Sequence, residues 1–303
     1  MQLKYRGITI PQGPSLARHR PVNITGALLL FALLLLPMHS AKAGESVEVA
    51  IFPYLSVHQL LSLYDPLRRH LEDELERPVR LVTSRDFASF IADTHQTPYT
   101  LLINAPHMAR LAEEEAGYNA ILRPEVSLYP VVVVQSEDPL ETLSDLRGAH
   151  IATPFGSAVI TMMAREILGE AGLEEGRDVH FVHAGSHNNA VEEMLNNPQV
   201  RAAIVSNPAF GVVSTRYQGR VERLMVDRAE RGLSPVVYLA GPGLSATEQE
   251  RLATILLEFA NQDAAGKAMM EQARHQGLRP FTPEDRLSLD VYLPATREAF
   301  TLP

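Results

Sequence analysis

Short apolar runs of strand length alternate with amphipathic runs of helix length from residue 47 to about residue 240. Several apolar runs, such as 131–134 and 202–205, place apolar side chains on both faces of the expected strand, which is typical of buried parallel strands. The alternation predicts an α/β fold with open, mainly parallel sheets flanked by helices. The expected strands are Val47–Tyr54, Val79–Ser84, Thr100–Ala105, Pro130–Gln135, Ala149–Thr153, Val179–Ala184, Arg201–Ser206, Val221–Val226 and Val236–Leu239.

After Gly241 the strand pattern stops and only helical spacing remains, over Thr247–Asn261, Gly266–Gln276 and Pro283–Leu293. No Gly/Ser-rich or Pro-rich linker interrupts the chain. Two domains would therefore have to be joined by extended segments that cross between them. The candidates are Ser127–Gln135 on the way out and Pro235–Gly243 on the way back.

The N-terminal residues have the pattern of an export signal. Four cations precede an apolar run over 27–36, which is far shorter than the roughly 20 residues needed to cross a bilayer. The run ends in Ala41-Lys42-Ala43, a small-x-small pattern that predicts cleavage after Ala43 and a periplasmic mature protein. A membrane anchor left in place is the alternative.

Composition narrows the function classes. The formal net charge of −9 argues against a nucleic-acid-binding protein, which needs a basic face. The absence of Cys excludes disulfides, thiolate metal sites, cysteine nucleophiles and a lipidated cysteine after the leader. We expect no cofactor and no bound metal. His180 and His183 lie on an expected strand at an odd offset, so they point to opposite faces and do not form a zinc cluster with His187.

Polar or small residues follow several expected strands just before a helix, where open α/β sheets bind ligands. The Gly156-Ser157 step has the parts that an oxyanion needs, namely backbone N–H groups and a hydroxyl at the positive end of a helix dipole. Ser157 as a simple helix cap, and His187 as a surface or capping residue, are the alternatives. The strand-end segments are Phe52–Tyr54 followed by Ser56, Asn104–His107, Thr153–Ser157, Gly185–Asn189 and Ser206–Pro208.

Several motifs, in their order, resemble the phosphate/phosphite/phosphonate-type periplasmic substrate-binding proteins of ABC transporters, a type II periplasmic-binding-protein-like family. The matching segments are 51–54, 64–71, 78–79, 83–90, 104–107, 117–118, 138–148 and 185–187. The resemblance implies a two-lobed α/β fold with hinge strands crossing between the lobes. Lobe 1 would comprise 44–129 with 240–303, lobe 2 would comprise 130–239, and 1–43 would be the signal peptide.

The resemblance also implies a ligand site between the lobes. Its expected residues are Tyr54, Asn104, His107, Gly156, Ser157 and His187, and the strand-end pattern adds Thr153 and Asn207. The hydroxyl cluster of the family is reduced here to Thr153 and Ser157, with Phe155 between them, and Asn188 stands where an acid is usual. The ligand therefore stays open among phosphate, phosphite, phosphonate and other solutes.

We expect a monomeric periplasmic solute-binding protein that captures a small anionic ligand for an ABC transporter permease. The same fold presenting a ligand-dependent surface to a membrane sensor kinase is the alternative. The sequence contains neither the Gly-x-Ser-x-Gly nucleophile motif of serine hydrolases nor a clear pair of catalytic side chains, so we do not expect an enzyme.

Overall fold

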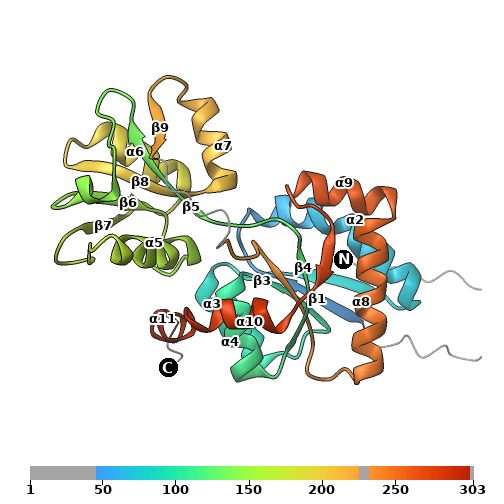
Figure 1. The fold of residues 1–303 in the computed structure, drawn as a ribbon. Helices are drawn as coiled ribbons and strands as arrows, with labels where there is room; N and C mark the ends of the chain where they lie inside the picture. Colours follow the sequence, from blue (N-terminus) through green and yellow to red (C-terminus); the bar gives the residue numbers. More distant parts are fainter. Residues whose placement is uncertain (1–45, 225–231, 301–303) are drawn as a thin grey trace, which may run out of the picture. The chain divides into compact units, whose positions relative to one another are not determined.

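A computed structural model describes residues 46–224 and 232–300 of the chain. The predicted signal peptide and its cleavage site lie outside the described residues. Within the described ranges the chain forms two separate β-sheets, each flanked by helices (Figure 1). The predicted α/β fold with two lobes is confirmed.

The first sheet has the strand order β11-β4-β10-β3-β1-β2. The helices that belong to this sheet form two groups. Helices α2, α8 and α9 pack on one another, whereas α4 contacts α3, α10 and α11. The strands are β1 (Val47–Ile51), β2 (Val79–Val82), β3 (Leu101–Asn104), β4 (Asn119–Pro124), β10 (Val237–Ala240) and β11 (Leu278–Pro280). The helices are α2 (Val57–Leu75), α3 (Phe87–Gln96), α4 (Pro106–Ala116), α8 (Ala246–Asn261), α9 (Ala264–Gln272), α10 (Pro283–Asp290) and α11 (Leu293–Ala299).

The second sheet has the order β7-β6-β8-β5-β9. The strands are β5 (Pro130–Gln135), β6 (His150–Thr153), β7 (His180–His183), β8 (Val200–Ser206) and β9 (Val221–Leu224). The helices are α5 (Val159–Glu170), α6 (His187–Asn196) and α7 (Asn207–Arg216), with a 3-10 turn, η2, at Leu143–Leu146.

Alternating residues of the central strands enter two different cores of the second lobe. Val132 and Val134 of β5 pack in the core that includes α5, whereas Val131 and Val133 pack in the core that includes α6 and residues of α7. Because successive side chains of a strand point to opposite faces, a strand covered on both faces must be apolar at every position. This accounts for the continuous valine run that marked β5 in the sequence.

Both sheets are mixed, so the expectation of mainly parallel sheets needs correction. β1, β2 and β3 are parallel to one another, as are β6, β7 and β8. β10 pairs antiparallel with β3 and β4, and β5 pairs antiparallel with β8 and β9. The physical reason is the crossing of the chain: β5 and β10 follow the segments that cross between the sheets, so they enter each sheet against its parallel strands.

The pairing of β10 places Val237–Ala240 in the first sheet. The division into 44–129 with 240–303 and 130–239 remains a proposal, and this pairing favours a return boundary a few residues earlier. None of the helices in the described ranges is both long and apolar enough to cross a bilayer.

Candidate ligand-binding site

Five helices begin around one cavity of about 700 Å³. The residues that immediately precede α2, α4, α5, α6 and α7 all line it, namely Ser56, Ala105, Ala158, Ser186 and Ser206. The first two helices belong to the first sheet and the other three to the second. A helix start carries free N–H groups and a partial positive charge, so this convergence makes the cavity electropositive without a cationic side chain.

The five helix starts differ in how their amides are satisfied. Ser56, Ser186 and Ser206 cap their own helices by accepting from Gln59, Asn189 and Ala209 amides. α4 and α5 begin after Ala105 and Ala158 and have no side-chain cap. Pro106 has no N–H, and the Thr161 amide donates to the Ala158 carbonyl at 2.9 Å, so the amides left for an external acceptor are those of His107 and Met108 in α4 and of Val159 and Ile160 in α5. The alternative that Ser157 caps α5 is wrong, because Ala158 stands at the cap position and the helix starts at Val159.

His187 is the first residue of α6 and lines the cavity. Gly185, at φ +81°, provides the left-handed turn that brings the chain into this helix. The Ser206 amide donates to His187 Nδ1 at 3.4 Å, so the neutral ring carries its proton on Nε2. Burial lowers the pKa of His187 to about 4, which leaves the ring neutral at physiological pH.

His107 lies in the first turn of α4, is 2% exposed and also lines the cavity. Its Nε2–H donates to the Ser157 carbonyl at 3.1 Å, because a carbonyl can only accept. This bond joins the two lobes. Nδ1 of His107 is buried and has no hydrogen-bond partner within the described part of the chain. Burial lowers the pKa of His107 to about 4, although the bond to Ser157 acts in the opposite direction.

Tyr54 follows β1 and lines the cavity. Its hydroxyl shares a 3.1 Å hydrogen bond with the Tyr64 hydroxyl, and its ring stacks on Phe52. Burial raises the pKa of Tyr54, with the Tyr64 bond acting against it. Of the expected site residues, the structure thus brings Tyr54, His107 and His187 to the same cavity.

Asn104, Thr153 and Asn207 do not line this cavity. Asn104 is 1% exposed and its Oδ1 accepts from the next amide at 2.9 Å. Thr153 Oγ1 lies 2.7 Å from His183 Nδ1 on the neighbouring strand. Asn207 bridges backbone groups of Ser127 and Tyr129, at 3.0 Å each, and so secures the crossing segment. All three side chains thus have at least one structural partner, although Nδ2 of Asn104 is buried without one among the described residues, and their predicted role in binding stays a prediction.

Gly156 and Ser157 also lie outside the lining of the cavity, in the turn before α5. A Cβ at Gly156 would lie 2.9 Å from Nε2 of His183, so the glycine allows the histidine side chain to approach closely. Ser157 contributes its carbonyl to the bond with His107. Their binding roles likewise remain predictions.

His275 lines the cavity and was not expected from the sequence. It follows Arg274, which has a left-handed backbone (φ 57°) and donates to the Pro208 carbonyl at 3.1 Å. Nδ1 of His275 is buried without a partner among the described residues, and burial lowers the pKa of His275 to about 4. A single histidine that follows a helix has no pattern in the sequence that would predict its place in the lining of a cavity.

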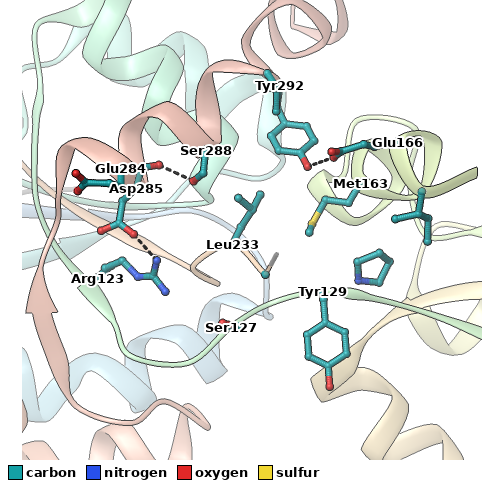
Figure 2. Close-up of a pocket in the computed structure, with 14 residues that line it drawn as sticks. Arg123, Ser127, Tyr129, Met163, Glu166, Leu233, Glu284, Asp285, Ser288 and Tyr292 are labelled. Atoms are coloured by element: carbon teal, nitrogen blue, oxygen red, sulfur yellow. Dashed lines mark hydrogen bonds and ion pairs between the residues drawn. The ribbon is translucent and has the colours of Figure 1, made fainter. Parts of the chain in front are cut away.

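A second cavity of about 510 Å³ lies beside the outgoing crossing segment, at Ser127 and Tyr129 (Figure 2). Its charged side chains have protein partners. Arg123 pairs with Asp285, and the Tyr292 hydroxyl donates to Glu166 of α5. The latter bond joins the C-terminal helices to the second lobe.

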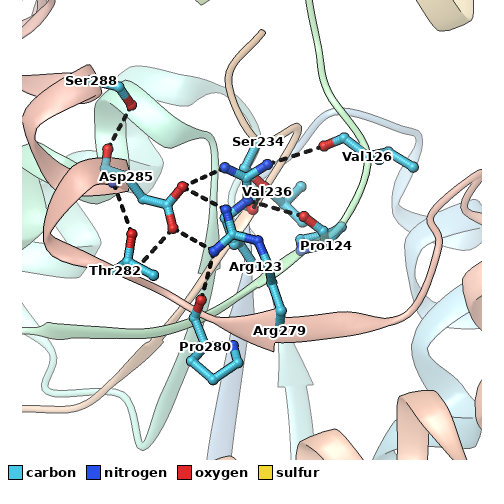
Figure 3. Close-up of polar contacts among 10 residues, drawn as sticks. All are labelled: Arg123, Pro124, Val126, Ser234, Val236, Arg279, Pro280, Thr282, Asp285 and Ser288. Atoms are coloured by element: carbon cyan, nitrogen blue, oxygen red, sulfur yellow. Dashed lines mark hydrogen bonds and ion pairs between the residues drawn. The ribbon is translucent and has the colours of Figure 1, made fainter. Parts of the chain in front are cut away.

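Asp285 is the centre of a polar network that holds the C-terminal segment to β4 (Figure 3). It accepts from Arg123 at 2.6 Å, from Arg279 at 2.7 and 2.8 Å, and from the Thr282 amide at 2.9 Å. Burial alone would raise the pKa of Asp285, but these hydrogen bonds and the nearby Arg123 charge lower it to about 2. Arg123 also donates to the Pro124 and Val126 carbonyls, so the network fixes the base of the crossing segment.

No group of three His, Cys, Asp or Glu side chains in the two described ranges is placed to hold a metal ion.

Comparisons with known proteins agree with the fold and extend it to a family. Residues 49–286 match the family described as "ABC transporter, phosphonate, periplasmic substrate-binding protein". No curated protein sequence matches the chain.

Solved structures are similar to the chain at low sequence identity. PhnD1 from Prochlorococcus marinus, in complex with methylphosphonate, has a TM-score of 0.67 at 12% identity, and the match covers 84% of this chain and 98% of PhnD1. XAC2383 from Xanthomonas citri, bound to ATP, has a TM-score of 0.67 at 16% identity with the same coverage. The aliphatic sulphonate binding protein SsuA from Escherichia coli has a TM-score of 0.62 at 16% identity and covers 83% of this chain and 87% of its own. At these identities the likeness concerns the fold alone.

The family match spans more than half of the chain and includes strands of both sheets, which confirms the resemblance seen in the sequence. The chain therefore belongs to the phosphonate-type periplasmic substrate-binding proteins of ABC transporters.

Proposed function

We propose that this protein binds a small organic or inorganic oxyanion between its lobes, as a monomer, and delivers it to the permease of an ABC transporter. The members of this family are substrate-binding components of ABC transporters, and neither the fold nor the family match favours the sensor-kinase alternative. The observation that carries the oxyanion proposal is the meeting of two uncapped helix starts, α4 from the first lobe and α5 from the second, at one cavity.

The chemistry of these helix starts suits an anion. Each contributes about 0.3–1 kcal/mol of favourable charge interaction near its first turn, and its free amides can donate to ligand oxygens. The Nε2–H of neutral His187 is a further donor beside them. A hydrogen bond to a charged group is worth about 1.5–3 kcal/mol, so each converging amide strengthens binding by roughly 10- to 150-fold.

The mechanism is capture by closure. His107 donates to the Ser157 carbonyl and Phe87 meets Phe155 edge to face, so the lobes already touch at the rim of the cavity. A ligand that accepts from α4 and α5 together adds contacts that an open arrangement lacks, and it therefore stabilises the closed state. No bond is made or broken in the ligand. We further propose that the protein is exported with cleavage after Ala43 and acts in the periplasm, without catalysis.

The test is a thermal-shift and calorimetric screen of the purified protein with phosphate, phosphite, methylphosphonate, phenylphosphonate, sulfate and acetate. A ligand at 100 times its dissociation constant adds about 2.7 kcal/mol of stability, which is readily seen. Phosphorus NMR of methylphosphonate after incubation should show the compound unchanged. If none of these anions shifts the melting temperature, the oxyanion proposal is wrong.

A backbone variant tests the role of α5 directly. Val159 is the first residue of α5, and Ala158 before it has φ −72° and ψ 138°, a conformation compatible with a following proline. Val159→Pro therefore removes one amide donor while keeping the helix start, since proline is favoured there. We expect a roughly 10- to 100-fold loss of affinity for the best anion of the screen.

The matched control is Ala246→Pro at the first position of α8, which does not line the cavity and is preceded by Ser245 at φ −64° and ψ 161°. It should bind as the wild type does. Unchanged affinity in Val159→Pro would remove the α5 amides from the site.

A further inference from the structure

Four aromatic side chains form one side of the cavity, and we call them the aromatic wall: Phe52, Tyr54, Phe87 and Phe155. Phe52 stacks on Tyr54 with 4.7 Å between ring centroids, and Phe87 lies 6.1 Å from Phe52. Phe155 meets Phe87 edge to face at 6.2 Å. The first three come from the first lobe and Phe155 from the second, so the aromatic wall continues across both lobes.

Phe155 is 45% exposed although it is a large apolar side chain. It lies in the turn between β6 and α5, on the same segment as the uncapped helix start. An exposed ring at a cavity wall gains free energy when an apolar group covers it, roughly in proportion to the area removed from water. The ring is therefore placed to contact a ligand whose anionic end lies at α5.

The lining of the cavity carries no formal charge. None of its described residues is Asp, Glu, Lys or Arg, and its histidines, His107, His187 and His275, are held neutral by burial. A ligand ammonium group would find no carboxylate here. A small, fully desolvated dianion would find no cation, and burying it is expensive without one.

The side-chain hydroxyl oxygens of the cavity already take part in hydrogen bonds within the protein. Ser56, Ser186 and Ser206 cap helices, and the Tyr54 hydroxyl is paired with that of Tyr64. The donors of the cavity include first-turn amides of α4 and α5, the Nε2–H of His187, and the hydroxyl protons of Ser186 and Ser206, whose oxygens only accept. These can serve one end of a ligand, while the aromatic wall faces the rest of it.

We propose that the ligand is an oxyanion with an apolar, aromatic body, of the aryl phosphonate class or a related aryl sulfonate or carboxylate, rather than phosphate, methylphosphonate or an aminophosphonate. This rests on the proposed function, since it assigns the anionic head to the helix starts. The aromatic body lies on the aromatic wall and covers Phe155.

Calorimetry with three phosphonates tests the proposal: phenylphosphonate, methylphosphonate and 2-aminoethylphosphonate, which share the head group and differ in the body. We expect phenylphosphonate to bind about tenfold or more tightly than methylphosphonate, and 2-aminoethylphosphonate to bind no better than methylphosphonate. Phe155→Ala should remove most of the preference for the phenyl compound while leaving methylphosphonate affinity nearly unchanged. Because Phe155 is exposed, the variant should keep the melting temperature of the wild type.

The control is Val212→Ala on α7, an equally exposed apolar side chain (44%) outside the cavity, which should change neither affinity. If methylphosphonate binds as tightly as phenylphosphonate, the inference is overturned while the proposed function stands. If Phe155→Ala weakens both ligands equally, the aromatic wall does not hold the ligand body and the inference is again overturned. If none of the three binds, the inference and the phosphonate form of the proposed function both fail.

Discussion

Replacing Asp285 by Asn should destabilise the protein far more than an ordinary ion-pair deletion. The Asp285 and Arg123 side chains are only 9% and 10% exposed, so the variant leaves a buried guanidinium without its carboxylate. Removing one partner of a buried pair costs about 3–5 kcal/mol. The lowering of the Asp285 pKa to about 2 gives a similar figure, about 2.5 kcal/mol at neutral pH.

The assay is urea unfolding followed by far-UV circular dichroism, because the chain has no Trp to report by fluorescence. The control is Asp138→Asn, which breaks the 2.6 Å pair with Arg201 where the two side chains are 65% and 39% exposed. An exposed pair contributes about 0–1 kcal/mol, so the control should unfold nearly as the wild type does.

The pH dependence gives a second readout. The folded-state pKa of Asp285 is depressed, so its stabilisation is present above the unfolded pKa of about 4 and is lost as the pH falls towards 2. The stability difference between wild type and Asp285→Asn should therefore be constant from about pH 8 to about pH 5 and then shrink. Equal losses in Asp285→Asn and Asp138→Asn would refute the reasoning that burial makes this network strong.

Three further outcomes are expected. Gly266→Ala in α9 should destabilise the protein, because the new Cβ would lie 1.8 Å from a backbone carbonyl oxygen of α8. Gly169→Ala in α5 has no atom within 4 Å of the new Cβ and should raise the free energy of unfolding in urea by up to about 1 kcal/mol. Equal effects of the two variants would contradict the packing argument. Mass spectrometry of the exported protein should find Gly44 as its first residue, and an intact leader would contradict the predicted cleavage after Ala43. The empty protein should lose stability in urea as the pH falls from about 6.5 to about 4, because cavity histidines such as His187 are neutral when folded and protonate when unfolded; a flat profile would show that the rings are not desolvated.

The strands that carry the fold could be predicted because buried parallel strands leave a clear pattern. The valine run of β5 and the apolar run of β8 face two cores each, and their predicted bounds match within a residue or two. β4 and β11 were missed because Asn119–Pro124 and Leu278–Pro280 mix Arg and Pro with apolar residues. Strand direction was also missed, because a periodic pattern reads the same in parallel and antiparallel pairs.

The site could be predicted only in part, because sequence gives the place of a polar residue but not its partner. His107 and His187 follow strands and start helices, and both reach the cavity. Thr153 is the last residue of β6 and starts no helix, and its register opposite His183 gives its hydroxyl a partner on the neighbouring strand. His275 reaches the cavity from the end of α9 through a left-handed turn at Arg274, which no spacing rule anticipates.

The missing caps of α4 and α5 have a consequence for how such a protein can change its specificity. If the anionic head is held by main-chain amides, that recognition is encoded by the path of the backbone and survives most side-chain substitutions. The aromatic wall, by contrast, is made of side chains and can be altered one residue at a time. Binding of the anionic head and selection of the organic group then depend on different parts of the site. Substitutions at positions such as Phe155 could change which organic group is bound while the main-chain amides of α4 and α5 continue to bind the anion.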